Sequence, residues 1–116
     1  MDTQTLFQYG VPIALVVGFI VFKRLGQVSR DAAHALVKDG ARLIDVRSPA
    51  EFSSGHIPGA TNIPVGQLGA HVKSLGAKDQ PIVVYCASGT RSAVARTVLK
   101  GQGFARVYNL GSMSRW

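Results

Sequence analysis

The chain has 116 residues, which is enough for one small domain but not for two. Its single cysteine excludes an internal disulfide and any all-cysteine zinc or iron–sulfur site within one chain. The 13 Lys and Arg residues outnumber the 6 Asp and Glu residues, and the net charge of +7 favours an anionic partner: a small anion, an anionic lipid or a nucleic acid.

Apolar residues are concentrated near the N-terminus. The run Leu6–Phe22 carries one strongly polar side chain and is followed at once by Lys23 and Arg24. A helix over this run spans roughly 25 Å, slightly less than a hydrocarbon core of about 30 Å, and bilayer thinning or snorkelling of the two basic side chains closes the difference. We predict a transmembrane helix over residues 6–22, between a tail of residues 1–5 and a linker of residues 23–27.

Two other interpretations of the apolar run stay open. One is a buried core helix, and the other is a cleaved signal peptide. A signal peptide fits less well because Met1–Thr5 has no basic residue and no small-residue cleavage site follows the run. An interfacial helix fits poorly because the run has no polar face.

The charges that flank the apolar run predict an orientation. Lys23, Arg24 and Arg30 follow the run, whereas no Lys or Arg precedes it. The positive-inside rule therefore predicts a single-pass membrane protein with its C-terminal domain in the cytoplasm. The same basic residues suit the anionic lipid of a cytoplasmic leaflet.

Small residues recur along one face of the predicted membrane helix. Gly10, Ala14 and Gly18 are spaced by four residues, and this spacing lets two membrane helices approach closely. Formation of a homodimer through this face is a further hypothesis.

Residues 28–116 are predicted to form one α/β domain in which helices and strands alternate. Helices are expected at residues 30–38, 49–54, 65–75 and 92–102, and strands at residues 42–47, 60–63, 81–85 and 106–110. Strands that are separated by helices pair in parallel, and ligands of such sheets bind beyond the carboxyl ends of the strands. The only cysteine, Cys86, directly follows the most apolar strand.

The loop after that strand is the predicted reactive site. Residues 86–92 read Cys-Ala-Ser-Gly-Thr-Arg-Ser. Small residues and a glycine let backbone N–H groups point inward, and such a nest at a helix N-terminus binds anions and stabilises a thiolate. Arg91 adds positive charge, so we expect a lowered pKa and nucleophilic reactivity for Cys86. A buried structural cysteine is the alternative interpretation.

Four sequence motifs follow one another along the predicted domain. They are Leu43–Arg47 with Pro49–Phe52, Gly55–Ala60 with Asn62–Pro64, Cys86–Ser92, and Gly103–Phe104 with Val107–Leu110 and Trp116. In this order they resemble the rhodanese (sulfurtransferase) family over nearly the whole domain. One departure is Gly111-Ser112, where the family usually has two glycines.

The resemblance implies a fold and an activity. The fold is a parallel five-stranded sheet with helices on both faces, and the activity is transfer of sulfur through a persulfide on Cys86. The residues implied to bind the anionic sulfur and the substrate are Ala87, Ser88, Gly89, Thr90, Arg91 and Ser92. Asp45 and Arg47 follow a strand motif and are expected to support the loop as a buried pair or to bind substrate. No cofactor is expected, and the three histidines show no metal-ligand spacing.

The length of the loop separates sulfur transfer from phosphate chemistry. Cysteine phosphatases and the related arsenate reductases place five residues between Cys and Arg, whereas four separate Cys86 from Arg91. A shorter loop makes a tighter cradle, which suits a persulfide sulfur better than a tetrahedral oxyanion. The hypothesis is therefore that Cys86 takes sulfur from thiosulfate or another sulfane donor and passes it to cyanide, a thiol or a protein.

Two competing functions stay open at this point. A sulfur relay would pass its persulfide only to a dedicated protein partner, and a non-catalytic binding module would use the same fold for docking. The intact loop from Cys86 to Arg91 disfavours the binding module but not the relay. No nucleic-acid motif accompanies the basic residues, so no nucleic-acid partner is expected.

Overall fold

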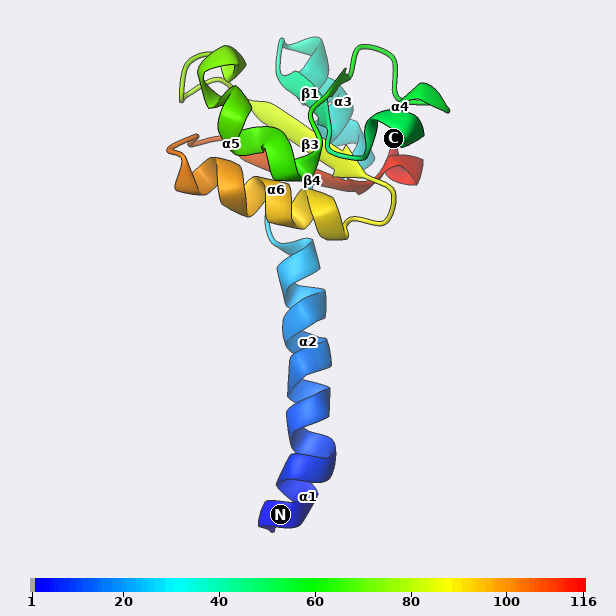
Figure 1. Cartoon of the computed structure of the whole chain (residues 1–116), viewed down its shortest axis with the longest axis vertical. Helices are drawn as coiled ribbons and strands as arrows, with labels where there is room; N and C mark the ends of the chain where they lie inside the picture. The colour runs from blue at the N-terminus through cyan, green and yellow to red at the C-terminus, as the bar shows by residue number, and fades with distance from the viewer. Residues whose placement is uncertain (1) are drawn as a thin grey trace.

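An N-terminal helical stem precedes an α/β head in the computed structural model, which describes residues 2–116 (Figure 1). The stem runs through α1 (Thr3–Thr5), a π-helical turn η1 (Leu6–Gly10) and α2 (Val11–Arg24). The head comprises residues 28–116. The molecule extends 53 Å along its longest axis because the stem projects from the head.

The stem is longer than the predicted 6–22 helix. Asp2 begins it, because its side chain accepts a hydrogen bond from the Thr5 N–H at 2.7 Å. The π turn lies just before Pro12, which has no N–H and whose ring would collide with an α-helical carbonyl one turn earlier. The helix Thr3–Arg24 has 22 residues, a mean hydropathy of 2.0 in its most apolar window, and no buried residue in that window. Its length of roughly 33 Å is enough to cross a hydrocarbon core.

The sheet of the head is parallel, as predicted, and has four strands in the order β2-β1-β3-β4. The strands are β1 (Arg42–Asp45), β2 (Thr61–Asn62), β3 (Ile82–Cys86) and β4 (Val107–Ser112). All five residues of β3 are buried, because β3 lies between two strands and is covered on both faces. The carboxyl ends of β1 and β3 are neighbours, with Asp45 paired to Tyr85.

The expectation of five strands is wrong for residues 2–116. At the outer edge of β4, the chain makes a single bridge between Gln27 and Asn109 instead of a fifth strand. The Asn109 N–H donates to the Gly26 carbonyl, and the Val28 N–H donates to the Asn109 carbonyl. Only a few residues lie between the end of α2 and Ser29, which caps the next helix, so there is no room for a longer strand.

Asn109 also joins the head to the stem through its side chain. Its Nδ2 donates to the Lys23 carbonyl, at the end of α2, at 3.4 Å. Its Oδ1 accepts a hydrogen bond from the Gly111 N–H at 2.8 Å. Asn109 is fully buried, so both polar ends of its side chain are used inside the protein. The stem and the end of β4 are therefore fixed to each other.

Helices cover both faces of the sheet, as predicted (Figure 1). On one face, α3 (Arg30–Lys38) packs on a cluster that includes Val83, Tyr85 and Trp116. On the other face, α6 (Thr90–Gly101) packs on a cluster that includes Val84, Cys86 and Leu99. The predicted 65–75 helix is interrupted, as the 3₁₀ turn η2 (Val65–Gln67), the short helix α5 (Leu68–His71) and the 3₁₀ turn η3 (Val72–Leu75).

Two shorter elements complete the head. A helical turn, α4 (Pro49–Ser53), begins at Ser48 with a capping box in which the Ser48 and Glu51 side chains each bind the other's backbone N–H. A 3₁₀ turn, η4 (Met113–Arg115), leads to Trp116, whose indole stacks on His34 with ring centroids 3.6 Å apart. This stacking leaves His34 half-buried.

The packing of α6 on the sheet predicts how much a cavity beneath that helix would lower the free energy of unfolding. Leu99 is fully buried, so Leu99→Ala is expected to lower the free energy of unfolding by about 2–5 kcal/mol. Val94→Ala on the same helix removes an exposed side chain and is expected to change it by less than about 0.5 kcal/mol. Urea unfolding of the full chain in detergent measures both, and equal effects would contradict this packing.

Candidate functional site

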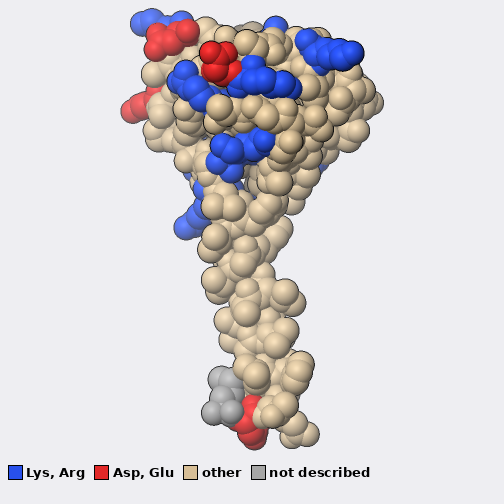
Figure 2. Space-filling view, turned by 90° about the vertical axis from the view of Figure 1, so that its left-hand side faces the viewer, with Lys and Arg blue, Asp and Glu red and all other residues tan. Residues whose placement is uncertain are grey.

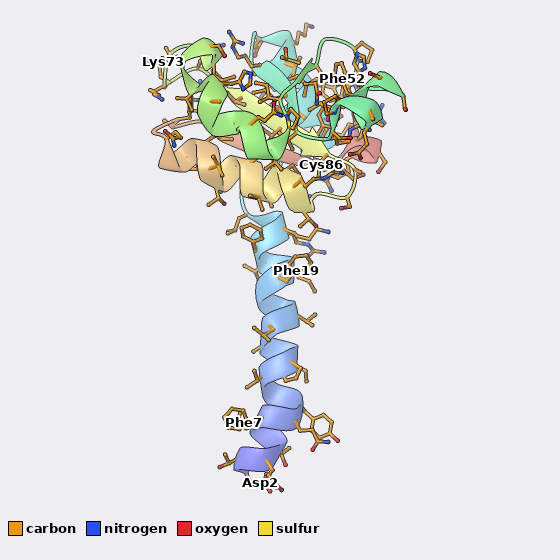
Figure 3. The ribbon with its side chains drawn as sticks, in the orientation of Figure 1. Asp2, Phe7, Phe19, Phe52, Lys73 and Cys86 are labelled. Carbon is orange, nitrogen blue, oxygen red and sulfur yellow. The ribbon has the colours of Figure 1, made fainter. Side chains whose placement is uncertain are left out.

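Cys86 ends β3, and its side chain lies in a pocket of backbone groups formed by the loop that leads into α6. Figure 3 shows it at the edge of the head from which the stem extends. Its thiol is fully buried. We call residues 86–92 the sulfur loop.

Two backbone N–H groups of the sulfur loop donate to the sulfur of Cys86. The Gly89 nitrogen lies 2.9 Å from Sγ, and the Ser92 nitrogen lies 3.4 Å from it. The Ser92 hydroxyl lies 3.4 Å from Sγ and also reaches the Gly89 carbonyl at 3.1 Å. Sulfur at the N-terminus of a 12-residue helix therefore faces two N–H donors, and no acidic side chain of residues 2–116 hydrogen-bonds to it.

These donors set the ionisation of Cys86. Burial raises the pKa of the thiol, because it disfavours the thiolate. The Ser92 hydroxyl and the N–H groups of Ser92, Gly89 and Ser88 lower it by more, so the net pKa lies below the ordinary value. The predicted lowering is thus found, although the groups responsible are loop donors and not a direct contact with Arg91.

The shape of the sulfur loop depends on glycine. Gly89 has φ of +97°, a conformation that other residues rarely adopt, and this conformation aims its N–H at the sulfur. The Cα of Gly111 would lie only 3.6 Å from a Cβ at Gly89, so the loop packs closely on the end of β4. Ser112, where the family usually has a second glycine, donates its hydroxyl to the Ala87 carbonyl at 2.7 Å and holds the loop there.

Arg91 forms an ion pair with Glu51 of α4 and makes no hydrogen bond to the sulfur within residues 2–116. The two guanidinium nitrogens lie 2.7 and 2.9 Å from the two carboxylate oxygens. Arg91 and the Ser48 N–H together lower the pKa of Glu51 to about 2. Since a carboxylate with a lowered pKa stays ionised at neutral pH, the pair ties the sulfur loop to α4 under ordinary conditions.

Asp45 and Arg47 form the buried pair that was one of the two predicted alternatives. Arg47 Nε lies 3.0 Å from both carboxylate oxygens of Asp45, and Nη2 lies 2.7 Å from Oδ2. Burial raises the pKa of Asp45, but the hydrogen bonds from Arg47 lower it below its ordinary value. Arg47 also donates to the Gly55 carbonyl at 2.7 Å, so the pair fixes the segment after β1. None of its hydrogen bonds within residues 2–116 reaches the sulfur loop.

The remaining predicted site residues lie in the same loop. Ala87 and Ser88 are exposed, Thr90 is half-buried, and neither the Ser88 nor the Thr90 hydroxyl makes a hydrogen bond to the sulfur among the described residues. Sequence reasoning missed Ser112 and Asn109, which support the loop from β4. The Gly111-Ser112 departure from the family pattern was the available signal for Ser112. In residues 2–116, no three His, Cys, Asp or Glu side chains lie together as a metal site would need.

The head is thus a parallel α/β domain that places a buried cysteine in a loop whose N–H groups donate to its sulfur. Residues 29–116 match the rhodanese-like domain family. This chain therefore belongs to that family of sulfurtransferases.

Curated relatives agree with this assignment. The chain is 35% identical to "Thiosulfate sulfurtransferase GlpE" of Pseudomonas entomophila over 96 residues, which cover 82% of this chain and 84% of that protein. It is 43% identical to "Uncharacterized protein YqhL" of Bacillus subtilis over 77 residues, which cover 66% of this chain and 60% of that protein.

A solved structure gives the same answer for the fold. The human single-domain sulfurtransferase TSTD1 is 28% identical to this chain, with a TM-score of 0.69. The superposition covers 78% of this chain and 91% of TSTD1. Most of a known single-domain relative therefore has its counterpart in this chain.

The sulfur geometry predicts how Cys86 titrates. Its thiolate is expected to form below the pKa of about 8.5 for a free thiol. Ser92→Ala is expected to raise the midpoint by about one pH unit, because a hydrogen bond to a charged group is lost. Ultraviolet absorbance of the thiolate, with Cys86→Ser as the blank, measures both midpoints.

Thr97→Ala is the matched control for that titration. Thr97 lies on the same helix as Ser92, and its hydroxyl donates to the Ala93 carbonyl. The lowered pKa also gives the stability of the fold a defined dependence on pH. Ionisation of Cys86 stabilises the fold above the unfolded thiol's pKa, and this contribution is lost as pH falls through the lower native pKa. An unchanged midpoint in Ser92→Ala would contradict the role of the Ser92 hydroxyl.

Proposed function

We propose that this chain is a membrane-anchored sulfurtransferase that carries sulfane sulfur as a persulfide on Cys86. The observation that carries the proposal is the sulfur loop, in which Gly89 and Ser92 donate N–H groups to a buried sulfur whose pKa is lowered. Membership of a family with thiosulfate sulfurtransferases supports thiosulfate, or a similar sulfane donor, as the source of sulfur.

The first step loads the cysteine. The Cys86 thiolate attacks the outer sulfur of thiosulfate and forms a new S–S bond, while the old S–S bond breaks and sulfite leaves with its electron pair. The Gly89 and Ser92 N–H groups, which donate to Sγ before loading, would stabilise the anionic persulfide, as an oxyanion hole stabilises an oxygen. The loop donors lower the pKa of Cys86, so formation of the thiolate needs no separate base.

The second step discharges the persulfide. A nucleophilic acceptor such as cyanide or a thiolate attacks the outer sulfur, and the Cys86 thiolate leaves with the electron pair of the S–S bond. Cys86 is the only cysteine in the sequence, so the acceptor comes from outside the chain.

The other loop residues act by positioning. Arg91 holds the sulfur loop to α4 through Glu51, and Ser112 holds Ala87 from the opposite side. The Asp45–Arg47 pair fixes the carboxyl end of β1, which neighbours the carboxyl end of β3. The exposed positions Ala87 and Ser88 are where an arriving donor meets the loop.

The sulfur chemistry is tested by intact mass of the purified full chain with and without thiosulfate. We expect a gain of one sulfur atom that is absent in Cys86→Ser and is discharged by cyanide as thiocyanate with repeated turnover. A persulfide that forms without turnover would assign the chain to a relay with a dedicated protein acceptor. The absence of a persulfide with any sulfane donor would overturn the proposal in favour of a binding module.

The anchoring half of the proposal rests on the stem. Helix Thr3–Arg24 is apolar, unburied and long enough to cross a bilayer, and Figure 2 shows it bare of charge between its tip and the head. We propose that residues 6–22 lie within the membrane, between the tail of residues 1–5 and the linker of residues 23–27. The domain of residues 28–116 would then face the cytoplasm. The face formed by Gly10, Ala14 and Gly18 would suit self-association of two stems.

Alkaline carbonate extraction tests the anchor. The full chain is expected to stay in the membrane pellet, whereas a chain with Leu15→Lys and Val16→Lys, both exposed on the stem, is expected to be released. A thiol-reactive, membrane-impermeant reagent then tests the orientation on Asp2→Cys in a Cys86→Ser background. Because the reagent reaches only the outer face of intact cells, labelling is expected without opening them. Labelling only after the cells are opened would overturn the orientation.

A further inference from the structure

A cavity of about 330 Å³ lies between the end of the stem, the sulfur loop and the C-terminal segment. Its basic side chains belong to Lys23, Arg24 and Arg115, and Ser88 and Gly89 line it from the sulfur loop. Its volume lies within the range of about 300–1,000 Å³ for small-molecule sites. It does not include Cys86, so it lies on the outer side of the loop from the sulfur.

The three cations of this cavity have no carboxylate partner. Within residues 2–116, the two ion pairs are Asp45–Arg47 and Glu51–Arg91. Arg115 is nevertheless held in place, because its guanidinium donates to the Leu110 and Val28 carbonyls, each at 2.8 Å. Those neutral acceptors orient Arg115 without cancelling its charge, so an anion entering the cavity meets an ordered cationic site.

The wall formed by the stem is apolar on one side and cationic on the other. Ile20 lines the cavity one turn before Lys23, and the Lys23 ammonium lies 5.7 Å from the centre of the Phe19 ring. In a chain anchored as proposed above, the end of α2 lies at the membrane surface. The cavity then spans the level at which phospholipid headgroups join their acyl chains.

We propose that this cavity binds the phosphate group of an anionic phospholipid. Lys23, Arg24 and Arg115 supply the positive charge, and the Ser88 hydroxyl, which also lines the cavity, supplies a neutral donor. The apolar wall at Ile20 receives the start of the acyl chains, and this feature favours a lipid over a free anion.

Lipid bound here touches the sulfur loop directly. Gly89 lines the cavity with one side of its backbone and donates its N–H to the Cys86 sulfur with the other. A Cβ at Gly89 would lie 3.6 Å from the last carbon of Lys23, so the end of the Lys23 side chain lies beside the loop. The headgroup therefore packs against the segment that holds the sulfur.

The test is lipid retention by the full chain in nanodiscs of phosphatidylcholine with a minor share of phosphatidylglycerol, read by native mass spectrometry. We expect phosphatidylglycerol to be retained in preference to phosphatidylcholine. Lys23→Gln and Arg115→Gln are each expected to lower that retention about fivefold, since each removes one charge near an anionic group. Arg24→Gln provides the same test without disturbing the hydrogen bonds of Arg115.

Arg30→Gln is the matched control, because Arg30 follows the stem closely but does not line the cavity. An equal loss of retention in Arg30→Gln would show diffuse attraction to the membrane and overturn the site. Inorganic phosphate in pure phosphatidylcholine nanodiscs, followed by phosphorus NMR, tests a soluble anion. Lys23-dependent broadening of its signal, with equal retention of the two lipids, would overturn the lipid in favour of a free ion.

This inference rests on the anchoring part of the proposed function, and their failures are distinguishable. A chain released by carbonate lacks the anchor, whereas an anchored chain without lipid preference lacks only the headgroup site. Lipid retention needs no sulfur chemistry, so it can be measured in Cys86→Ser.

Discussion

A buried sulfur anion has to be compensated where it sits, and the head of this protein is arranged around that requirement. Cys86 is buried, so a thiolate at this position is stabilised by the N–H groups of Gly89 and Ser92 and not by solvent. Those N–H groups point inward only if the chain curls sharply between β3 and α6. The left-handed conformation of Gly89 provides the curl, and the start of α6 supplies aligned donors.

The supports of the sulfur loop come from three directions and use different interactions. Arg91 ties it to α4 by a partly exposed ion pair, Ser112 ties Ala87 to β4 by a neutral hydrogen bond, and Gly111 allows close backbone packing. The Asp45–Arg47 pair acts one strand away and is buried, so removing either partner would leave an uncompensated charge. Geometry at the sulfur is therefore secured by residues that never touch it.

Local patterns in the sequence predicted the helices, the four strand positions and the loop, because each has a short-range signature. The apolar run of β3 is such a signature. The count of five strands was wrong because it came from family resemblance, while the path from α2 to Ser29 leaves room for one bridge. The partners of Asn109 and Ser112 lie far away in sequence, at Lys23 and Ala87, and no local pattern reports such contacts.

The Asn109 contact also decides how the head can move. Its side chain donates to the Lys23 carbonyl, and its backbone N–H and carbonyl pair with Gly26 and Val28 on either side of Gln27. These three hydrogen bonds oppose rotation of the head relative to the stem. In a bilayer, the stem would then hold Cys86 at a constant height above the surface. Small donors would still arrive by diffusion in three dimensions and meet the loop at Ala87 and Ser88. A membrane-bound acceptor, in contrast, would meet it by lateral diffusion in two dimensions, and only if its own thiol stood at the same height.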